Sequence, residues 1–233
     1  FSTAMAPKLL EKAMNLLSLR SRGEYCTDRV VHNCLNFVNM SIELGNIYKL
    51  LRPHMDFLLF QIAFPCLCLS EDDVKTFKTD PHEFIHRAND PLQDYQHPKQ
   101  PAIVLISNLV QYRQKDAADK FLGFVTQILT NYASSSPEMR DYRQKDGALV
   151  AIGSLQNILK SKKRYSVSLE GLLVQHVIPE FSSEIGFIRS RACWMMQHFA
   201  DIKFSNQAVF IQCLISVTNL LKDKELPVQV EAA

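Results

Sequence analysis

Apolar and polar residues alternate along almost the whole chain with the spacing of an α-helix. Apolar side chains recur every three or four positions, which gathers them on one face of a helix and leaves polar residues on the other. Residues 205–222 show this clearly, because Val209, Phe210, Cys213 and Leu214 begin one apolar stripe. No segment keeps the period of two that indicates a half-buried strand. The pattern therefore predicts an all-α protein.

The predicted helices end at residues that commonly stop helices, such as "SSSP" at 134–137, "SKKRY" at 161–165 and Pro227. The predicted ranges are 3–20, 27–43, 47–68, 81–89, 98–112, 116–132, 138–160, 166–178, 186–201, 205–222 and 226 onward. These helices are too short and too evenly spaced for one bundle. A repeat architecture is the better interpretation.

Small residues near the start of alternate helices indicate the period of the repeat. Ala102, Ala148, Ala192 and Ala232 follow one another at intervals of 46, 44 and 40 residues. Two helices in about 40–47 residues are typical of HEAT and armadillo repeats, in which stacked helix pairs supply the core that no single pair could bury. We predict an α-α superhelix, a HEAT-repeat solenoid of about five helix pairs that forms a single array over 1–233. The expected repeats are 1–43, 46–112, 115–160, 165–201 and 205–233. We also expect the chain to be a segment of a longer protein.

A long insertion at 69–97 interrupts this rhythm between the two helices of the second predicted pair. It is acidic at first and then rich in proline and histidine, and loops of this length are usually functional or disordered. Glu71, Asp72 and Asp73 form an acidic triplet near its start. The triplet is either a solvated part of a loop or a patch whose negative field attracts a basic partner. It is the candidate partner-binding site of the chain.

The same insertion contains "HEFIH", a match to the H-E-x-x-H pattern of zinc hydrolases. On a helix, His82 and His86 would share one face and Glu83 could act as a general base. However, Asp80 is a natural N-cap, Pro81 suits the first helical position, and Glu83 completes a capping box, so helix initiation already explains these residues. A zinc hydrolase would also need a third ligand, and the next ten residues contain neither histidine nor glutamate. We therefore predict no metal site, and a zinc hydrolase stays only a distant alternative.

The composition excludes several classes of function. With 47% hydrophobic and 21% charged residues the chain is that of an ordinary soluble protein, and a net charge of +2 gives no electrostatic reason to expect binding to nucleic acid or membranes. The longest apolar run, 57–69, is too short to span a bilayer and is interrupted by Gln61 and Pro65. The chain has neither a glycine-rich phosphate loop nor a nucleophile elbow. We expect an intracellular protein that is not an enzyme and has no catalytic residues and no cofactor.

The six cysteines include no C-x-x-C pair, and Cys34, Cys193 and Cys213 fall inside apolar helical patterns. This distribution indicates buried thiols in a reducing compartment, without a disulfide framework. Cys66 and Cys68 have no second pair nearby, which argues against a zinc ribbon.

Three longer stretches carry a resemblance to a known family: "RQKDGALVAIGSLQNILKSKKRY", "HVIPEFSSEIGFIRSRACWMMQHFADIKF" and "LPVQVEAA". They closely resemble the importin-β (karyopherin-β) family, nearest to the branch of importin seven and importin eight. "LRPHMDFLLFQIAFPCLCLSEDD" followed by an acidic loop and "DPHEFI" agrees with the same branch. The similarity covers essentially the whole chain.

The resemblance implies a monomeric nuclear transport receptor that shuttles between cytoplasm and nucleus. Its implied partners are the GTP form of the GTPase Ran, protein cargo that is often basic, and phenylalanine-glycine nucleoporins. The chain resembles an interior part of such a receptor, so the best-defined Ran contacts of the family cannot be transferred to it. The alternative function is a HEAT scaffold subunit of another assembly, such as a phosphatase or a chromosome-organising complex.

Other charged and aromatic residues have structural interpretations. We interpret Lys160, Lys162, Lys163 and Arg164 as a helix C-terminus and turn, where cations complement the helix dipole, although they could pass for a nuclear localisation signal. In HEAT stacks, cations placed like Arg189 and Arg191 often pair with acidic loop residues of a neighbouring repeat. Trp194, the only tryptophan, is expected in the core.

Overall fold

The computed structural model describes residues 5–90, 92, 95–112 and 117–233. Every regular element in those ranges is a helix, which confirms the predicted all-α class. The first residues of the helices predicted from 3 and from 116 lie outside the described residues. The division into five repeats of a single array stays a prediction.

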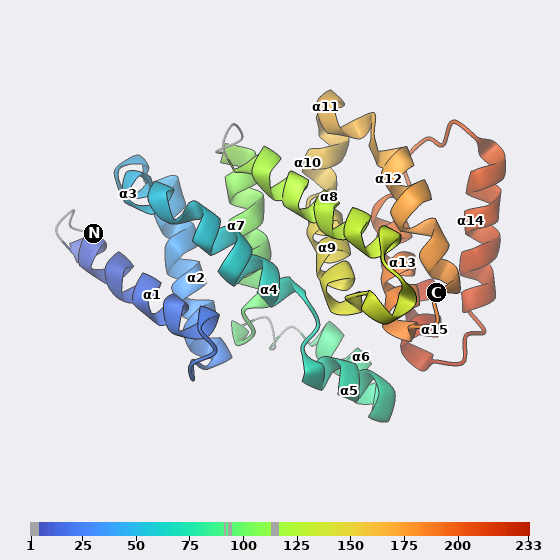
Figure 1. The fold of residues 1–233 in the computed structure, drawn as a ribbon, viewed down its shortest axis with the longest axis horizontal. Helices are drawn as coiled ribbons and strands as arrows, with labels where there is room; N and C mark the ends of the chain where they lie inside the picture. Colours follow the sequence, from blue (N-terminus) through green and yellow to red (C-terminus); the bar gives the residue numbers. More distant parts are fainter. Residues whose placement is uncertain (1–4, 91, 93–94, 113–116) are drawn as a thin grey trace. The chain divides into compact units, whose positions relative to one another are not determined.

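The chain folds as two compact units, and the first comprises Phe1–Leu67 and Asp90–Phe124. Its elements are α1 (Met5–Ser21), α2 (Asp28–Glu43), α3 (Gly45–Leu51), a 3₁₀ turn (Arg52–His54), a π-helical stretch (Phe57–Ala63), α4 (Phe64–Leu67), α7 (Lys99–Tyr112) and the start of α8 (Ala118–Ser134). Figure 1 shows α1, α2 and α7 of this unit in blue to green.

The core of the first unit lies between α2 and its neighbours α1 and α7. Leu17, Leu35 and Leu105 are completely buried there, and burial of one such side chain contributes about 1.5–3 kcal/mol. The α2 helix begins at Thr27, whose side chain accepts a hydrogen bond from the Val30 amide. Each of these helices therefore packs against its neighbour through a buried apolar stripe, as the sequence pattern predicts.

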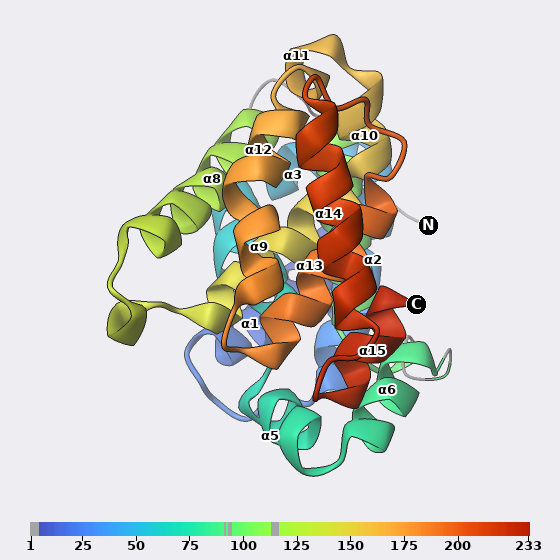
Figure 2. The ribbon, with the colours of Figure 1, turned by 90° about the vertical axis from the view of Figure 1, so that its right-hand side faces the viewer.

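The second unit comprises Cys68–Asn89 and Val125–Ala233. Its elements are α5 (Glu71–Thr79), α6 (Pro81–Asn89), the end of α8, a 3₁₀ turn (Pro137–Met139), α9 (Tyr142–Ser154), α10 (Gln156–Ser161), α11 (Lys163–Ser166), α12 (Leu169–His176), a 3₁₀ segment (Ile178–Ser182), α13 (Gly186–His198), α14 (Gln207–Leu220) and α15 (Leu226–Ala232). The α13 helix is central, because it packs against both α9 and α15. Figure 2 shows α5, α6 and α15 gathered at one end of this unit, where α6 contacts α15.

The start of the insertion is not the loop that the sequence predicts. Residues Glu71–Thr79 form the α5 helix, which precedes the correctly predicted α6. The two short helices pack against each other as a hairpin that belongs to the second unit. The acidic triplet occupies the first turn of α5, where negative charge is stabilised by the helix dipole. The prediction missed this helix because its nine residues contain few apolar positions.

Three predicted helices are interrupted. The segment predicted at 47–68 contains a 3₁₀ turn at Pro53 and a π-helical stretch before Pro65. Proline lacks the amide hydrogen and crowds the carbonyl four residues earlier, so the helix changes type at both prolines, to a tighter 3₁₀ turn at Pro53 and to a wider π-helical stretch before Pro65. The segment predicted at 138–160 divides at Leu155 into α9 and α10, and that at 166–178 passes from α12 into a 3₁₀ segment.

All six cysteines are free thiols, as predicted, but only half of them are buried. Cys34, Cys193 and Cys213 are buried within helices, whereas Cys66 and Cys68 are intermediate in exposure. Burial raises the pKa of the Cys66 thiol and of the Cys193 thiol to about 12. In the described ranges no helix combines the length and the apolar character needed to cross a bilayer.

Candidate functional site

The acidic triplet of the sequence begins α5, and one of its three members is engaged in starting the helix. Ser70 is the N-cap: its hydroxyl accepts a hydrogen bond from the Asp73 amide at 3.0 Å. The Asp73 carboxylate accepts in return from the Ser70 amide at 2.8 Å and from the Ser70 hydroxyl at 2.7 Å. This reciprocal arrangement is a capping box, which satisfies amides that a helix start otherwise leaves unpaired. Asp73 therefore has a structural role.

Glu71 and Asp72, in contrast, present their carboxylates to solvent. Their side chains are 93% and 70% exposed. Glu71 lies 3.5 Å from a terminal nitrogen of Arg143, and Asp72 accepts a hydrogen bond of 3.0 Å from Arg87. Exposed ion pairs of this kind are weak and exchange readily with other charged partners. These two carboxylates are the part of the triplet that is accessible to a partner.

The HEFIH motif lies on α6 and works as a helix start. The Asp80 carboxylate accepts a hydrogen bond of 3.0 Å from the Glu83 amide, which confirms the predicted N-cap. The Glu83 carboxylate accepts from Arg87 at 2.7 Å, one turn along the helix. His82 and His86 are both exposed. Within the described ranges no three histidine, cysteine or acidic residues are grouped so as to hold a metal ion.

Aromatic side chains anchor the hairpin to the rest of the second unit. Phe77 on α5 is buried, with its ring centroid 5.0 Å from that of Phe84 on α6 and 6.1 Å from that of Phe187 on α13. Gly186, at the start of α13, is close to the same ring. A Cβ atom at this position would overlap the Glu225 carboxylate and come within 2.9 Å of the Phe77 ring. This close approach requires glycine at position 186.

Arg189 pairs with acids of a connecting segment, as predicted, whereas the acid that pairs with Arg191 lies on a helix, not in a loop. Arg189 donates two hydrogen bonds of 2.7 Å to Asp223, and its Nη2 lies 3.1 Å from Glu225. These bonds raise the pKa of the Arg189 guanidinium. Arg191 donates from Nε to the buried Asp146 at 2.7 Å and lies over the Trp194 ring at 4.7 Å. The two arginines thereby connect α13 to the segment before α15 and to α9.

A second buried polar cluster was not foreseen from the sequence. Lys145 of α9 is 1% exposed, and its ammonium lies 3.2 Å from the Glu180 carboxylate and 4.5 Å from the centre of the Tyr132 ring. The Tyr132 hydroxyl donates to Glu180 at 3.3 Å. His176 is buried nearby, and desolvation followed by the positive charge of Lys145 lowers the pKa of its imidazole. All four side chains face the interior, so the cluster acts on stability.

The basic run begins as predicted, with Lys160 in the last turn of α10. Its ammonium donates to the His198 carbonyl at 2.9 Å and to the Asp201 carboxylate at 2.7 Å. Lys163 and Arg164, however, lie in the short helix α11, where a turn was predicted.

Trp194, which was expected in the core, is only partly buried. Its ring covers Gly153 of α9 and lies 3.9 Å from the ring of His198.

Comparison with known proteins connects this arrangement to a family. A family model described as Cse1 matches residues 2–228. The "Importin beta-like SAD2 homolog" of Arabidopsis thaliana is 38% identical over 232 residues, which cover 100% of this chain and 22% of the relative. "Importin-8" of Homo sapiens is 31% identical over 234 residues, with the same coverage. The "Probable importin-7 homolog" of Dictyostelium discoideum is 30% identical over 206 residues, which cover 88% of the chain and 19% of the relative.

A solved structure has the same fold. The structure described as "The exportin Cse1 in its cargo-free, cytoplasmic state" superposes with a TM-score of 0.79, over 99% of this chain and 26% of that one, at 19% sequence identity. At this identity the likeness shows the fold alone, which is the predicted HEAT-repeat solenoid. The chain spans about a fifth of the length of the curated relatives it matches.

Proposed function

Because this chain belongs to the Cse1 family of importin-β-type HEAT-repeat transport receptors, we propose that it serves in the import of protein cargo through the nuclear pore. The observation that carries the proposal is the match of the family model over residues 2–228. The importin names of relatives that align with the whole chain support the same role. The proposed partners are cargo proteins, phenylalanine-glycine nucleoporins and the GTP form of Ran, and the proposed location is both cytoplasm and nucleus.

The proposed mode of action is binding by shape, without a chemical step. Each helix pair of a solenoid contributes a small rotation, so a long array offers an extended surface that can close around a partner. Arg189 and Arg191 hold successive pairs in register through buried ion pairs. Binding of cargo and of Ran would then be coupled, so that each changes the affinity for the other by the same factor.

This role is tested with the full-length protein immobilised on beads and loaded with a basic cargo protein. We expect Ran locked in its GTP form to bind and to displace the cargo, and Ran in its GDP form to leave the cargo in place. Retention of phenylalanine-glycine repeats in the same assay would support passage through the pore. Failure to bind either Ran or the repeats would favour a scaffold subunit of another assembly.

The accessible part of the acidic triplet is the proposed contact for basic cargo. Glu71 and Asp72 are largely exposed and adjacent, so their fields add at the surface of α5. The variant Glu71→Gln/Asp72→Asn removes two charges while leaving the Ser70–Asp73 capping box intact. We expect about fivefold weaker binding of a basic cargo at low salt and a smaller difference at high salt.

A matched control removes two exposed carboxylates elsewhere, at Glu24 and Glu184. Both variants change the net charge equally, so a general electrostatic effect would weaken binding to the same extent in each. Equal affinities of the two variants for the cargo would rule out a specific contact at α5.

A further inference from the structure

A groove of 530 Å³ lies in the second unit between α5, the segment that precedes α9 and the start of α13. Its apolar lining includes Val74 of α5, Met139, and Ile185 and Phe187 beside the α13 start. Met139 is 77% exposed, so its side chain is accessible to a partner. This groove is shallow and open, and it has room for one or two side chains of a partner. The apolar lining indicates that the enclosed side chain is itself apolar.

The acidic groups along this groove already have hydrogen-bond donors. Asp141 is the N-cap of α9, and its two carboxylate oxygens accept from the Gln144 amide and from the Gln144 side chain, each at 2.9 Å. Glu138 is bonded to its own backbone amide and to Ser136, which lowers the pKa of its carboxyl. Both carboxylates keep their charge, and the lining sets these two acids against the three cations Lys78, Arg140 and Arg143.

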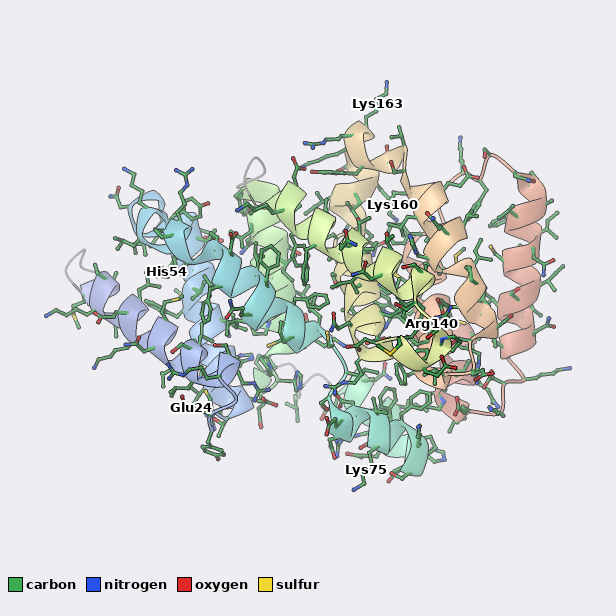
Figure 3. All side chains as sticks on the ribbon, in the orientation of Figure 1. Glu24, His54, Lys75, Arg140, Lys160 and Lys163 are labelled. Carbon is green, nitrogen blue, oxygen red and sulfur yellow. The ribbon has the colours of Figure 1, made fainter. Side chains whose placement is uncertain are left out.

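The cationic groups, in contrast, retain unused donors. The Lys78 ammonium is exposed and has no ion-pair partner among the described residues. Arg140 donates from Nε to the Ser135 carbonyl at 3.3 Å and lies over the Tyr132 ring, which leaves its terminal nitrogens open to the groove rim. Figure 3 labels Arg140 beside α9.

Arg143 adds a third cation to the lining. It donates from Nε to the Leu69 carbonyl at 2.6 Å, and one terminal nitrogen lies 3.5 Å from the exposed Glu71 carboxylate. That ion pair is solvent-exposed and weak, so a carboxylate of a partner can replace it. The rim therefore offers guanidinium and ammonium donors of the kind that bind carboxylates.

We propose that this groove is a docking site for an acidic peptide segment that carries one or two large apolar side chains. The apolar part of the segment occupies the space over Val74, Met139 and Phe187, and the flanking carboxylates pair with Lys78 and Arg140. The three cations of the lining outnumber its two carboxylates, and the donors of Lys78 and Arg140, which lack an ion-pair partner among the described residues, favour an anionic partner over a cationic one. This inference stands on the groove alone and does not depend on a role in nuclear transport.

The experiment measures fluorescence anisotropy of a labelled peptide with glutamates on either side of a leucine–phenylalanine pair, bound to the full-length protein. Lys78→Glu should weaken binding about tenfold, because it reverses a charge at the rim. Lys75→Glu is the matched control: it makes the same change on the same helix, at a position that does not line the groove. Figure 3 labels Lys75 on α5. We expect it to leave the affinity within about twofold of the unchanged protein.

The apolar part of the proposal has its own test. Met139→Ser should weaken binding of the same peptide about fivefold, since it removes exposed apolar surface without touching a charge. A peptide with serines in place of leucine and phenylalanine should bind the unchanged protein correspondingly less well.

Several outcomes would overturn the inference. If Lys78→Glu and Lys75→Glu weakened peptide binding equally, the effect would be a long-range electrostatic attraction and not a contact in the groove. Equal binding of a peptide with lysines in place of glutamates would refute the selection for an anionic partner. Lys78→Glu or Met139→Ser could also leave the peptide affinity unchanged but alter the self-association of the protein measured by light scattering. That result would assign the groove to contacts between copies of the protein.

Discussion

Arg189 and Asp223 form a bidentate ion pair in which both side chains are only 7% exposed. Two parallel hydrogen bonds of 2.7 Å join the guanidinium to the carboxylate, and Arg189 also donates to the Ser183 carbonyl at 2.8 Å. Asp223 in turn accepts from the Glu225 amide at 2.9 Å. The pair thus holds the start of α13 against the segment that leads into α15.

Breaking this pair from either side should strongly destabilise the fold. Arg189→Ala leaves the buried Asp223 carboxylate without its ion-pair partner, and we expect it to lower the free energy of unfolding by about 3–5 kcal/mol. Asp223→Ala should lower it by less, because the Glu225 carboxylate remains 3.1 Å from the guanidinium. The double variant Arg189→Met/Asp223→Leu should lose clearly less than the sum of the two. Urea denaturation followed by circular dichroism measures all three.

The exposed pair Lys120–Asp56 supplies the control for that measurement. It has a comparable separation of 3.1 Å, but its side chains are 59% and 62% exposed. We expect Lys120→Ala to cost less than about 1 kcal/mol. Similar costs for the buried and the exposed pair would contradict the argument from burial.

His176 should make the stability sensitive to mild acid. Burial, followed by the charge of Lys145, lowers the pKa of the His176 imidazole in the folded state. The unfolded chain then binds the proton more readily below about pH 6.5, so stability falls as the pH decreases through that value toward the folded-state pKa. The loss is limited to about 1.4 kcal/mol per pH unit.

His176→Gln removes this titration and isolates its contribution. The unfolding free energy of the variant should change less between about pH 7.5 and about pH 5.5 than that of the unchanged protein. The neighbouring Glu180 and Lys145 are present in both proteins, so the difference between the two profiles reports on His176. Parallel profiles would show that the imidazole keeps its ordinary affinity for protons.

Helical periodicity was enough to predict the fold class, because most helices bury one long apolar stripe. The α5 helix escaped detection because "EDDVKTFKT" has only Val74 and Phe77 on its apolar face. Its start is encoded in the Ser70–Asp73 capping box, a signal that the acidic composition concealed. The interruptions at Pro53 and Leu155 were missed for another reason, since an apolar stripe continues across a change in helix type.

The sites were less predictable than the fold, because they depend on residues far apart in the sequence. Arg189 and Arg191 could be expected to form ion pairs, but their acids lie 34 and 45 positions away, and several carboxylates were equally plausible. The Lys145–Glu180 pair and the groove beside Met139 gave no sequence signal. Lysine inside an apolar helix or methionine in a connecting segment has no distinctive spacing.

The Ser70 cap should control the local stability of α5. Ser70→Ala removes the hydroxyl that accepts from the Asp73 amide, at a cost of about 1 kcal/mol. Amides of Glu71–Thr79 should then exchange with deuterium about fivefold faster, while those of α13 keep their rates. Lys75→Ala is the control on the same helix, because Lys75 is exposed and outside the cap. Equal acceleration in both variants would mean that the cap does not determine opening of the hairpin.

Gly153 should be essential for the seating of Trp194. A Cβ atom at Gly153 would overlap the Trp194 ring and approach the Met195 sulfur at 3.2 Å. We expect Gly153→Ala to cost about 1–3 kcal/mol, because the indole must move out of a packed contact between α9 and α13. Trp194 is the only tryptophan in the sequence, so its fluorescence reports the displacement directly.

Gly171→Ala is the matched control: nothing lies within 4 Å of its added Cβ, and alanine in a helix should be neutral or stabilising by up to about 1 kcal/mol. If Gly153→Ala changed neither the emission spectrum nor the free energy of unfolding, α9 and α13 would not be tightly packed at Gly153 and Trp194.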